Sequence, residues 1–278
     1  RLDDPAARRW LTDHLSGQIA AGGVDVYRND FNIDPLPFWR GNDAPDRQGM
    51  TEIRYIEGLY AMWDELLARH PGLVIDNCSS GGRRIDLETC MRSIPLWRSD
   101  TNCSPGHCDW NQSHSCGLSQ YVPLHTACAW TPEPYEMRSD ATAGLICQWD
   151  YRAEGFQLEE AKAALAEAKE NQRYWYGDLY PLTPQSVALE HWCAFQLHRA
   201  DLNEGLVLVF RREQSAYTGL ETRLRGLDAD TAYSVVCIDN EGNAEESTRQ
   251  GRELMDGFDV HVPQRRDSLV IRYRPATP

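Results

Sequence analysis

The chain has 278 residues, which at about 150 residues per domain predicts one large domain or two ordinary ones. Hydrophobic residues make up 41% and charged residues 25% of it, a globular composition that excludes a disordered or fibrous protein. The formal charge of -14 argues against nucleic acid and anionic membrane surfaces as partners, and the lack of any apolar run of about 18 residues argues against a membrane-spanning helix.

Helices and short strands alternate from the start of the chain. Asp4-Pro5 and an apolar repeat of 3.6 residues predict a helix that ends at Gly22-Gly23. A short strand, Val24 to Tyr27, follows, and then a Pro-rich loop through Asp46. A second amphipathic helix is predicted from Thr51 to His70.

Two further short strands end in polar residues. Leu73 to Ile75 leads into a turn rich in Ser and Gly, and Ile94 to Trp97 leads into Arg98-Ser99-Asp100. Strands alternating with helices predict parallel βαβ units in a barrel or an open sheet. The weaker elements that continue this pattern are strands at Tyr121 to Trp130 and Leu145 to Trp149 and helices near Tyr135 to Ala143 and at Gln157 to Tyr176.

From about Thr183 the pattern changes to strands separated by turns, which predicts an antiparallel β-sandwich of under about 100 residues. The predicted strands are Val187 to Leu197, Gly205 to Phe210, Leu220 to Leu224, Ala232 to Ile238, Phe258 to Val262 and Ser268 to Tyr273. We therefore divide the chain into residues 1–182 and 183–278.

A complete (β/α)8 barrel takes about 250 residues, whereas only about 180 precede the sandwich, with about five strands. We therefore expect an incomplete TIM (β/α)8 barrel followed by the sandwich, the first barrel units lying in a missing segment or a second chain. The opening residues, Arg1 to Pro5, contain neither an initiator Met nor a signal peptide, which fits a fragment or a processed chain.

Asp30 and Asp100 each follow a predicted strand by a few residues. Catalytic groups of α/β barrels stand at the carboxyl ends of the strands, so these two carboxylates are expected to face one cavity. Glycoside hydrolysis requires two carboxylates flanking one bond. The alternative is that each is a helix cap or a turn residue.

The turn from Cys78 to Gly82 has small residues that let a ligand approach the backbone closely, and Arg84 offers a directional donor. A plain tight turn is the alternative. A phosphate cradle is disfavoured, because the segment lacks the spacing and the Lys of a P-loop. Trp39 and Trp97 lie in or beside the loops, where a ring can stack on a sugar, although core packing is the alternative.

Three segments resemble motifs of the α-galactosidases of glycoside hydrolase family 36, the melibiase group. Gly23 to Asn32 resembles the fourth-strand motif, in which a Lys-Trp-Asp-x-Asn run carries the nucleophile. Asn77 to Asp86 resembles the Cys-Ser-x-Gly-Gly-x-Arg-x-Asp segment after strand five, and Trp97 to Asp100 is similar to the Trp-x-Ser-Asp motif after strand six. The resemblance covers most of the first 180 residues, and the sandwich agrees with the family's C-terminal domain.

The resemblance implies a retaining α-galactosidase that acts on α-galactoside oligosaccharides or glycoconjugates, with barrel strands of about 4 to 8 in this chain. Asp30 is then the nucleophile and Asp100 the acid/base, which has to carry a proton at rest; the charge of Asp30 favours that proton. No cofactor and no metal are expected. The substrate-binding residues that we predict are Arg28, Asn32, Trp39, Cys78, Ser79, Gly81, Arg84 and Trp97.

The sequence departs from the family at two positions, where Arg28 replaces Lys and Asn29 replaces Trp. Arg holds a hydroxyl with a planar fork rather than a point charge, so an α-N-acetylgalactosaminidase or another α-glycosidase is the alternative. A non-catalytic carbohydrate-binding module is the alternative from a different class. The chain by itself is expected to be inactive without the earlier strands, and the family commonly forms homo-oligomers.

Nine Cys, an odd number in a chain too large to need disulfide staples, favour reduced thiols and slightly favour a cytoplasmic location. Some of them cluster with His at positions whose spacing permits zinc or a disulfide, although a loop flanking the sugar pocket, with thiols as small apolar side chains, is favoured. The cluster consists of Cys103, His107, Cys108, His114 and Cys116.

Overall fold

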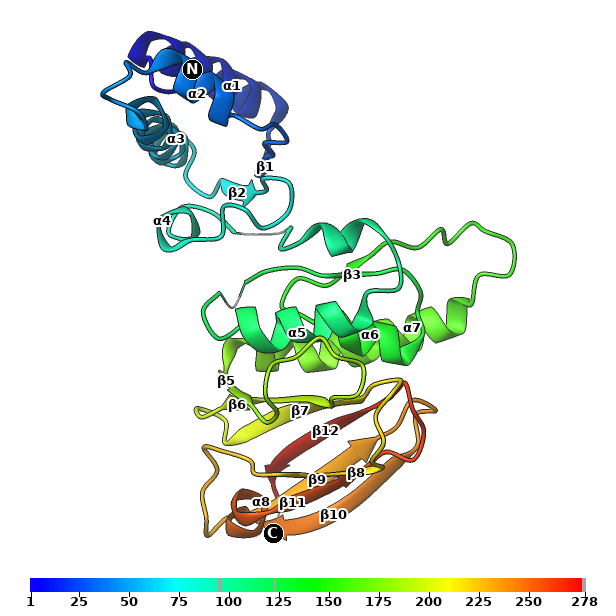
Figure 1. The fold of residues 1–278 in the computed structure, drawn as a ribbon. Coiled ribbons are helices and arrows are strands. Elements are labelled where there is room, and N and C mark those ends of the chain that lie inside the picture. The colour runs from blue at the N-terminus through cyan, green and yellow to red at the C-terminus, as the bar shows by residue number, and fades with distance from the viewer. Residues whose placement is uncertain (95–96, 123, 277–278) are drawn as a thin grey trace. The chain divides into compact units, whose positions relative to one another are not determined.

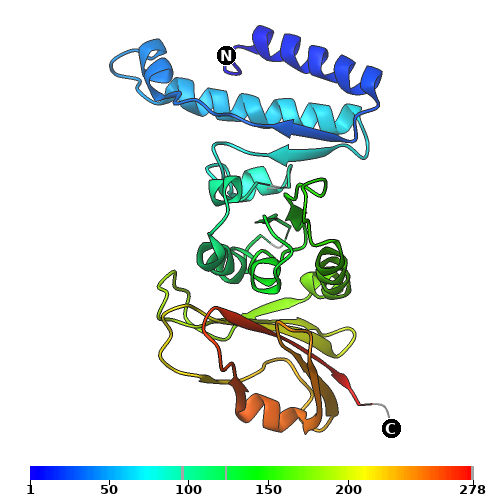
Figure 2. The ribbon, with the colours of Figure 1, turned by 90° about the vertical axis from the view of Figure 1, so that its right-hand side faces the viewer.

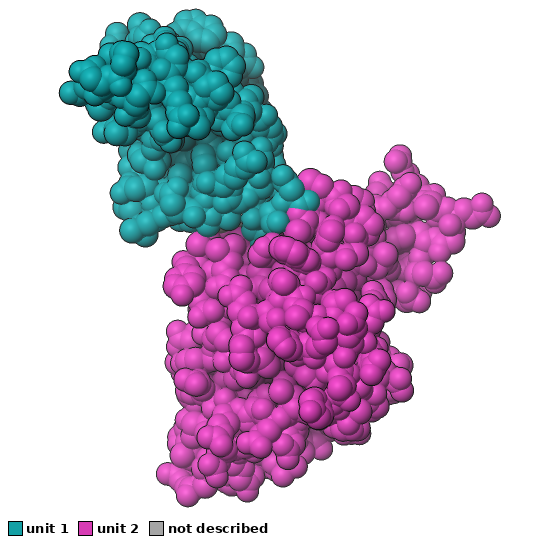
Figure 3. Space-filling view, in the orientation of Figure 1, with its two compact units in different colours: residues 1–100 teal, residues 101–278 magenta. Residues whose placement is uncertain are grey.

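The computed structural model describes residues 1–94, 97–122 and 124–276 (Figure 1). They form two compact units, residues 1–100 and 101–278 (Figure 3). Within the described residues, no helix combines the length and the apolar character that crossing a bilayer requires.

The first unit opens with helix α1 (Pro5–Gly22), as predicted. The Asp4 side chain accepts a hydrogen bond from the Ala6 amide, and Pro5 occupies the first turn, where an amide hydrogen is not needed. Gly23 ends the helix in the left-handed conformation, with φ of 59°. Helix α3 (Met50–Arg69) matches the second predicted helix and packs against α1 (Figure 2).

Strands β1 (Val26–Asn29) and β2 (Val74–Asn77) pair in parallel, as the βαβ pattern predicts. The loop after β1 contains a short helix, α2 (Leu36–Asn42), that the sequence analysis missed. Its first turn holds Pro37, which a helix tolerates there. Prolines in this segment suggested an irregular loop, whereas here they begin a helix.

The third predicted strand lies partly outside the described residues, because Pro95 and Leu96 are not described. Ile94 bridges Asp76 of β2 in parallel, and its amide donates to the Ile75 carbonyl at 2.9 Å. Helix α4 (Leu87–Cys90) precedes it, begun by Asp86 in a capping box. The start of this segment therefore adjoins β2, as a third parallel strand requires.

The core of the first unit lies between helices α1 and α3 and the face of β2 that carries Ile75. Ile75 is buried there, whereas Asp76 beside it points to the other face of the strand, because successive side chains alternate. The buried apolar residues are Leu2, Ile19, Leu59, Met62, Trp63, Leu66, Leu73 and Ile75.

The second unit begins with short elements. Strands β3 (Cys128–Ala129) and β4 (Ile146–Cys147) pair in parallel. They lie within the two weaker predicted strands, but each is only two residues long. The 3-10 helix η1 (Asp100–Cys103) starts at the junction of the units. The helices are α5 (Cys108–Leu118), α6 (Pro134–Ser139), α7 (Leu158–Asn171) and the 3-10 helix η2 (Gln172–Tyr176).

An antiparallel sheet of order β10-β9-β12-β7-β6-β5 dominates the second unit (Figure 1). Its strands are β5 (Asp178–Pro181), β6 (Cys193–Arg199), β7 (Glu204–Arg211), β9 (Ala232–Ile238), β10 (Ala244–Gln250) and β12 (Asp267–Pro275). A second sheet pairs β8 (Gly219–Thr222) with β11 (Phe258–His261), and helix α8 (Gly251–Asp256) lies between β10 and β11 in the chain.

The central strands of the large sheet are buried on both faces, whereas its edge strand β10 is exposed. On the face toward the small sheet, Val207 and Val209 of β7 belong to the same buried cluster as Val260 of β11. Leu208 and Phe210 alternate with them and pack on the other face, against residues of α5, α6 and η2. The predicted sandwich is therefore present, with a helical layer on its second face; the division at residues 182/183 stays a prediction.

Candidate active site

Neighbouring residues of β1 and β2 place four functional groups on one face. Arg28 and Asp76 are direct partners in the parallel register. Asp30 and Cys78 come directly after the ends of β1 and β2, two residues beyond this pair, so continued alternation puts them on the same side. Asp30, the predicted nucleophile, is thus the next residue on this face after the Arg28–Asp76 pair.

Asp30 is surrounded by donors. The Arg28 Nη2 donates to Asp30 Oδ2 at 3.3 Å. Burial opposes ionisation, but hydrogen bonds from the side chains of Cys78 and Asn32, with the Arg28 charge, lower the pKa of Asp30 below its ordinary value. Asp30 is therefore ionised at neutral pH, as a carboxylate nucleophile must be.

Cys78 is buried, at 3% exposed. This burial and the neighbouring carboxylate of Asp30 raise the pKa of the Cys78 thiol, while its backbone contact and Arg28 oppose the rise. The thiol is therefore protonated at neutral pH and lies beside Asp30 as a neutral group.

The turn after β2 has a backbone that few residues adopt. Ser80 and Gly81 have φ of 44° and 78°, and the Ser79 amide donates to the Gly81 carbonyl at 3.1 Å. Asn32 Oδ1 accepts from the Ser80 amide at 3.0 Å, and Ser79 Oγ donates to the Phe31 carbonyl at 3.1 Å. The turn is thus fastened to Phe31 and Asn32.

The same turn adjoins Asp100. A Cβ added to Gly81 falls 3.0 Å from the Asp100 amide nitrogen, and one on Gly82 falls 2.4 Å from the Arg98 carbonyl oxygen. Only glycine allows this close approach of the two backbones. The structure therefore brings Asp30 and Asp100 to one turn, although 70 positions separate them in the sequence.

Trp97 connects this carboxylate to the arginine. Its Nε1 donates to Asp100 Oδ1 at 3.1 Å, and the Arg28 guanidinium carbon lies 5.5 Å from the centre of its ring. Arg28 is thus in contact with Asp30 directly and with Asp100 through Trp97.

Two of the predicted binding residues lie on the other face of β1. Arg84 donates to the carbonyls of Asn29 and Cys78 at 2.7 and 2.6 Å, and Trp39 packs on Tyr55 with ring centres 5.4 Å apart. Both line a cavity of about 450 Å³ whose wall includes Asn29, the residue that alternates with Arg28. Their role in sugar binding stays a prediction.

Asp76 is the residue that the sequence analysis missed. It lies beside Arg28 in the register and accepts a hydrogen bond from Arg28 Nη1 at 2.7 Å. The available signal was its position two residues before Cys78, on the face of the strand that carries the site.

The cysteine and histidine cluster does not assemble as a metal site, since no group of three or more metal-ligating side chains occurs within the described ranges. Cys108 and Cys116 lie on α5, which the sequence analysis read as part of a loop. Burial raises the pKa of Cys108 to about 12, so its thiol behaves as a small apolar group.

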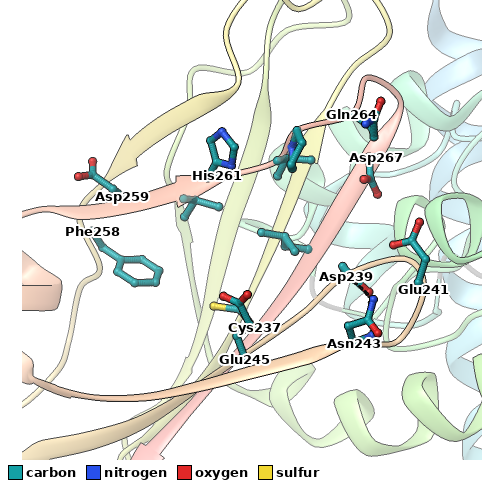
Figure 4. A pocket seen from close by; sticks show the side chains of 14 residues that line it. Cys237, Asp239, Glu241, Asn243, Glu245, Phe258, Asp259, His261, Gln264 and Asp267 are labelled. Atoms are coloured by element: carbon teal, nitrogen blue, oxygen red, sulfur yellow. Dashed lines mark hydrogen bonds between the residues drawn. The ribbon is translucent and has the colours of Figure 1, made fainter.

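A second cavity, of about 460 Å³, lies in the β-sandwich (Figure 4). The side chains of Asp239, Glu241 and Asp267 gather at one end, and Phe258 lies at the other. Burial, followed by the charges of Glu241 and Asp239, raises the pKa of Asp267. None of the predicted substrate-binding residues is among the described residues that line it.

Sequence comparison finds relatives of known activity. The Melibiase family model matches residues 6–111, which include both carboxylates. Alpha-galactosidase Mel36A of Lactobacillus acidophilus is 22% identical over 243 residues, covering 81% of this chain and 32% of that protein. Alpha-galactosidase AgaA of Geobacillus stearothermophilus is 25% identical over 241 residues, with the same two coverages. The chain spans about a third of the length of these curated relatives.

Solved structures share the fold. The alpha-galactosidase of Lactobacillus brevis has a TM-score of 0.82 at 18% identity and covers 100% of this chain, which matches 39% of that one. AgaA bound to 1-deoxygalactonojirimycin has a TM-score of 0.80 at 21% identity, with coverages of 99% and 39%. Further structures of AgaA variants hold raffinose or stachyose. At these identities the likeness shows the fold.

Proposed function

Because the chain belongs to the melibiase family, glycoside hydrolase family 36, we propose that it carries the catalytic carboxylates of a retaining α-galactosidase. The substrates are terminal α-galactosides of oligosaccharides or glycoconjugates, as the relatives' names and the sugars bound to AgaA suggest. In this proposal residues 1–182 supply strands 4 to 8 of a (β/α)8 barrel and residues 183–278 its C-terminal β-sandwich.

The proposed reaction has two steps. Asp30 attacks the anomeric carbon, the bond to the leaving oxygen breaks, and Asp100 gives its proton to that oxygen. Asp100, now a carboxylate, then takes a proton from water, whose oxygen attacks the anomeric carbon and releases Asp30. The lowered pKa of Asp30 supports its assignment as the nucleophile.

One observation carries the proposal, namely the meeting of both carboxylates at the Cys78–Gly82 turn. The Cys78 side chain helps to lower the pKa of Asp30, and the Asp100 carboxyl carbon lies 3.4 Å from the position that a Cβ on Gly81 would take. An N-cap or a turn residue has no reason to share such a neighbour with a second carboxylate from a distant loop. Cys78, Ser79, Gly81, Asn32, Arg28 and Trp97 are the groups proposed to line the galactose subsite.

The nature of the sugar is the finer part of the proposal. Arg28 stands where the family has Lys, and its fork already contacts two carboxylates. An α-N-acetylgalactosaminidase that uses the same carboxylates is therefore the second candidate. Initial rates on a panel of aryl α-glycosides separate the two: the galactoside is expected to be hydrolysed fastest, and a preference for the N-acetyl sugar selects the alternative.

The mechanism is tested with the full-length protein and an aryl α-galactoside. Asp30→Asn and Asp100→Asn are each expected to reduce turnover by a factor of about 10³ or more, whereas Asp34→Asn, an exposed carboxylate of the same loop, leaves it unchanged. Proton NMR of the first product is expected to show α-galactose. Unchanged turnover in both variants would falsify the proposal, and β-galactose as the first product would replace retention by inversion.

A further inference from the structure

Asp76 is a buried carboxylate beside the predicted nucleophile. Its side chain is 9% exposed, against 39% for Arg28 and 32% for Asp30. Oδ2 accepts from Arg28 Nη1 at 2.7 Å, and Oδ1 has no hydrogen-bond partner within the part of the chain that the structure describes. Arg28 is thus the cation that pairs with this buried carboxyl group, and removing it would leave the group buried without a partner charge.

The guanidinium of Arg28 is held at three places. Its Nη1 contacts Asp76, its Nη2 contacts Asp30 at 3.3 Å, and its central carbon lies over the Trp97 ring. A planar fork makes the two carboxylate contacts from separate nitrogen atoms held in a fixed geometry, whereas an ammonium group would make both from one nitrogen. The hydrogen bond to Asp76, at 2.7 Å, is shorter than the one to Asp30, and Asp76 is the more buried of the two carboxylates.

Stability alone does not account for this ion pair. Replacing a buried ion pair by apolar residues is often neutral or stabilising. Valine or leucine at these positions would therefore give the folded state about as much stability as the pair does. Its geometry, in contrast, fixes the direction in which the guanidinium meets Asp30 and Trp97.

Resting on the proposed function, we infer that Asp76 is a positioning residue, which holds Arg28 between the nucleophile and the Trp97 partner of the acid/base. Arg28 is attracted to two carboxylates while Asp30 is ionised. Once Asp30 has formed its bond to the anomeric carbon, it is a neutral ester, and of these two carboxylates only Asp76 then still attracts the guanidinium, which also lies over the Trp97 ring. Asp76 thus preserves the arrangement of the site through both steps of the reaction.

This role has a signature in the pH profile. The charged or titratable groups near Asp30 are Arg28, Asp76 and Cys78 on its own face, Asp100 at the Cys78–Gly82 turn, and Arg84, whose charge acts from the other face of β1. With Asn at position 76, the positive charge of Arg28 is no longer shared between two carboxylates. It therefore attracts Asp30 more strongly, which favours the ionised form of Asp30. The acidic limb of kcat/KM is therefore expected to move to lower pH in Asp76→Asn, while a loss of folding alone leaves the limb where it was.

The experiment measures kcat and KM across pH for the full-length wild type, Asp76→Asn and Asp76→Glu. We expect Asp76→Asn to lower kcat about tenfold or more with the shifted limb, and Asp76→Glu to keep the limb of the wild type. Glu167→Gln is the matched control, because Glu167 pairs with the buried Arg138 in the second unit. Wild-type kcat and an unmoved limb in Asp76→Asn overturn the inference.

A double variant decides the matter where Asp76→Asn does not fold. Arg28→Ala leaves a buried charge, and Arg28→Ala/Asp76→Asn removes it, so the double variant is expected to fold at least as well as Arg28→Ala. Because Asp76 acts through Arg28, the double variant should have the activity of Arg28→Ala within about twofold. A further loss of about tenfold contradicts the inference. An inactive wild type contradicts the proposed hydrolase instead, so the two failures are distinct.

Discussion

Cys78 neighbours Asp30 just beyond the ends of two parallel strands, and its side chain helps to lower the pKa of the Asp30 carboxyl. The contact follows from the register, in which Arg28 and Asp76 are partners and the next residues on the same face are Asp30 and Cys78. A buried thiol is a weak donor, but with Asn32 and Arg28 it is sufficient to favour the ionised carboxylate.

Removing this donor is expected to shift the pH dependence of the reaction. Cys78→Ala takes away a hydrogen bond that lowers the pKa of Asp30, so the pKa rises and Asp30 becomes protonated at a higher pH. The acidic limb of kcat/KM then moves to higher pH. Cys78→Ser keeps a donor and is the control: its limb is expected to stay near that of the wild type. A limb unaffected by alanine contradicts the assignment of Asp30.

Replacing Asp100 is expected to have an effect that depends on the leaving group. Asp100→Ala removes the proton donor, which matters most when the leaving alkoxide is basic. We expect hydrolysis of an alkyl galactoside to fall by a factor of about 10² to 10⁴, and that of a dinitrophenyl galactoside far less. The slope of log kcat/KM against leaving-group pKa measures the difference. Equal losses for both substrates exclude Asp100 as the general acid.

Gly81 is expected to be irreplaceable for activity. Its φ of 78° and the 3.0 Å approach to the Asp100 amide mean that alanine is strained and also displaces Asp100. Gly81→Ala should lose about 1–3 kcal/mol of stability and at least tenfold in kcat. Gly72, with φ of 94° and open space around its Cβ position, is the matched control. Gly72→Ala should lose stability alone; equal activity losses contradict the claim.

The second unit should respond to loss of its buried aromatic contact. Phe210 is fully buried, and its ring meets that of Tyr135 edge-on with centres 5.9 Å apart. Phe210→Ala is expected to lower the free energy of unfolding by about 3–5 kcal/mol in urea. Tyr217→Ala, at a side chain that is 77% exposed, should change it by less than about 0.5 kcal/mol. Similar values for both would mean that the sheet's second face is not packed as described.

The amphipathic elements of the fold were predictable from the sequence. Helix α3 carries its apolar residues on one face, and α1 has Pro in its first turn and Gly after its end. Helix α5 was missed because its buried side chains include Asn111, Gln112 and Ser113, so no apolar period marks it. Strand β10 was missed because all its residues are exposed, as an edge strand allows.

The candidate site was predictable where its motifs are local. The turn from Cys78 and the carboxylates after two strands were identified from residue order alone. The sequence did not reveal that Trp39 and Arg84 lie on the other face of β1, since that depends on how the loop after β1 and the turn after β2 fold back. Nor did it single out Asp76, whose role depends on the register between β1 and β2.

The most direct test of the account is to identify the residue that bonds to the sugar. A fluorinated galactosyl fluoride that slows the second step is incubated with the full-length protein, and the digest is examined by mass spectrometry. We predict that the peptide containing Asp30 gains the mass of one fluorogalactosyl group, and that Asp30→Asn gains none. Attachment to any other carboxylate would contradict the central claim.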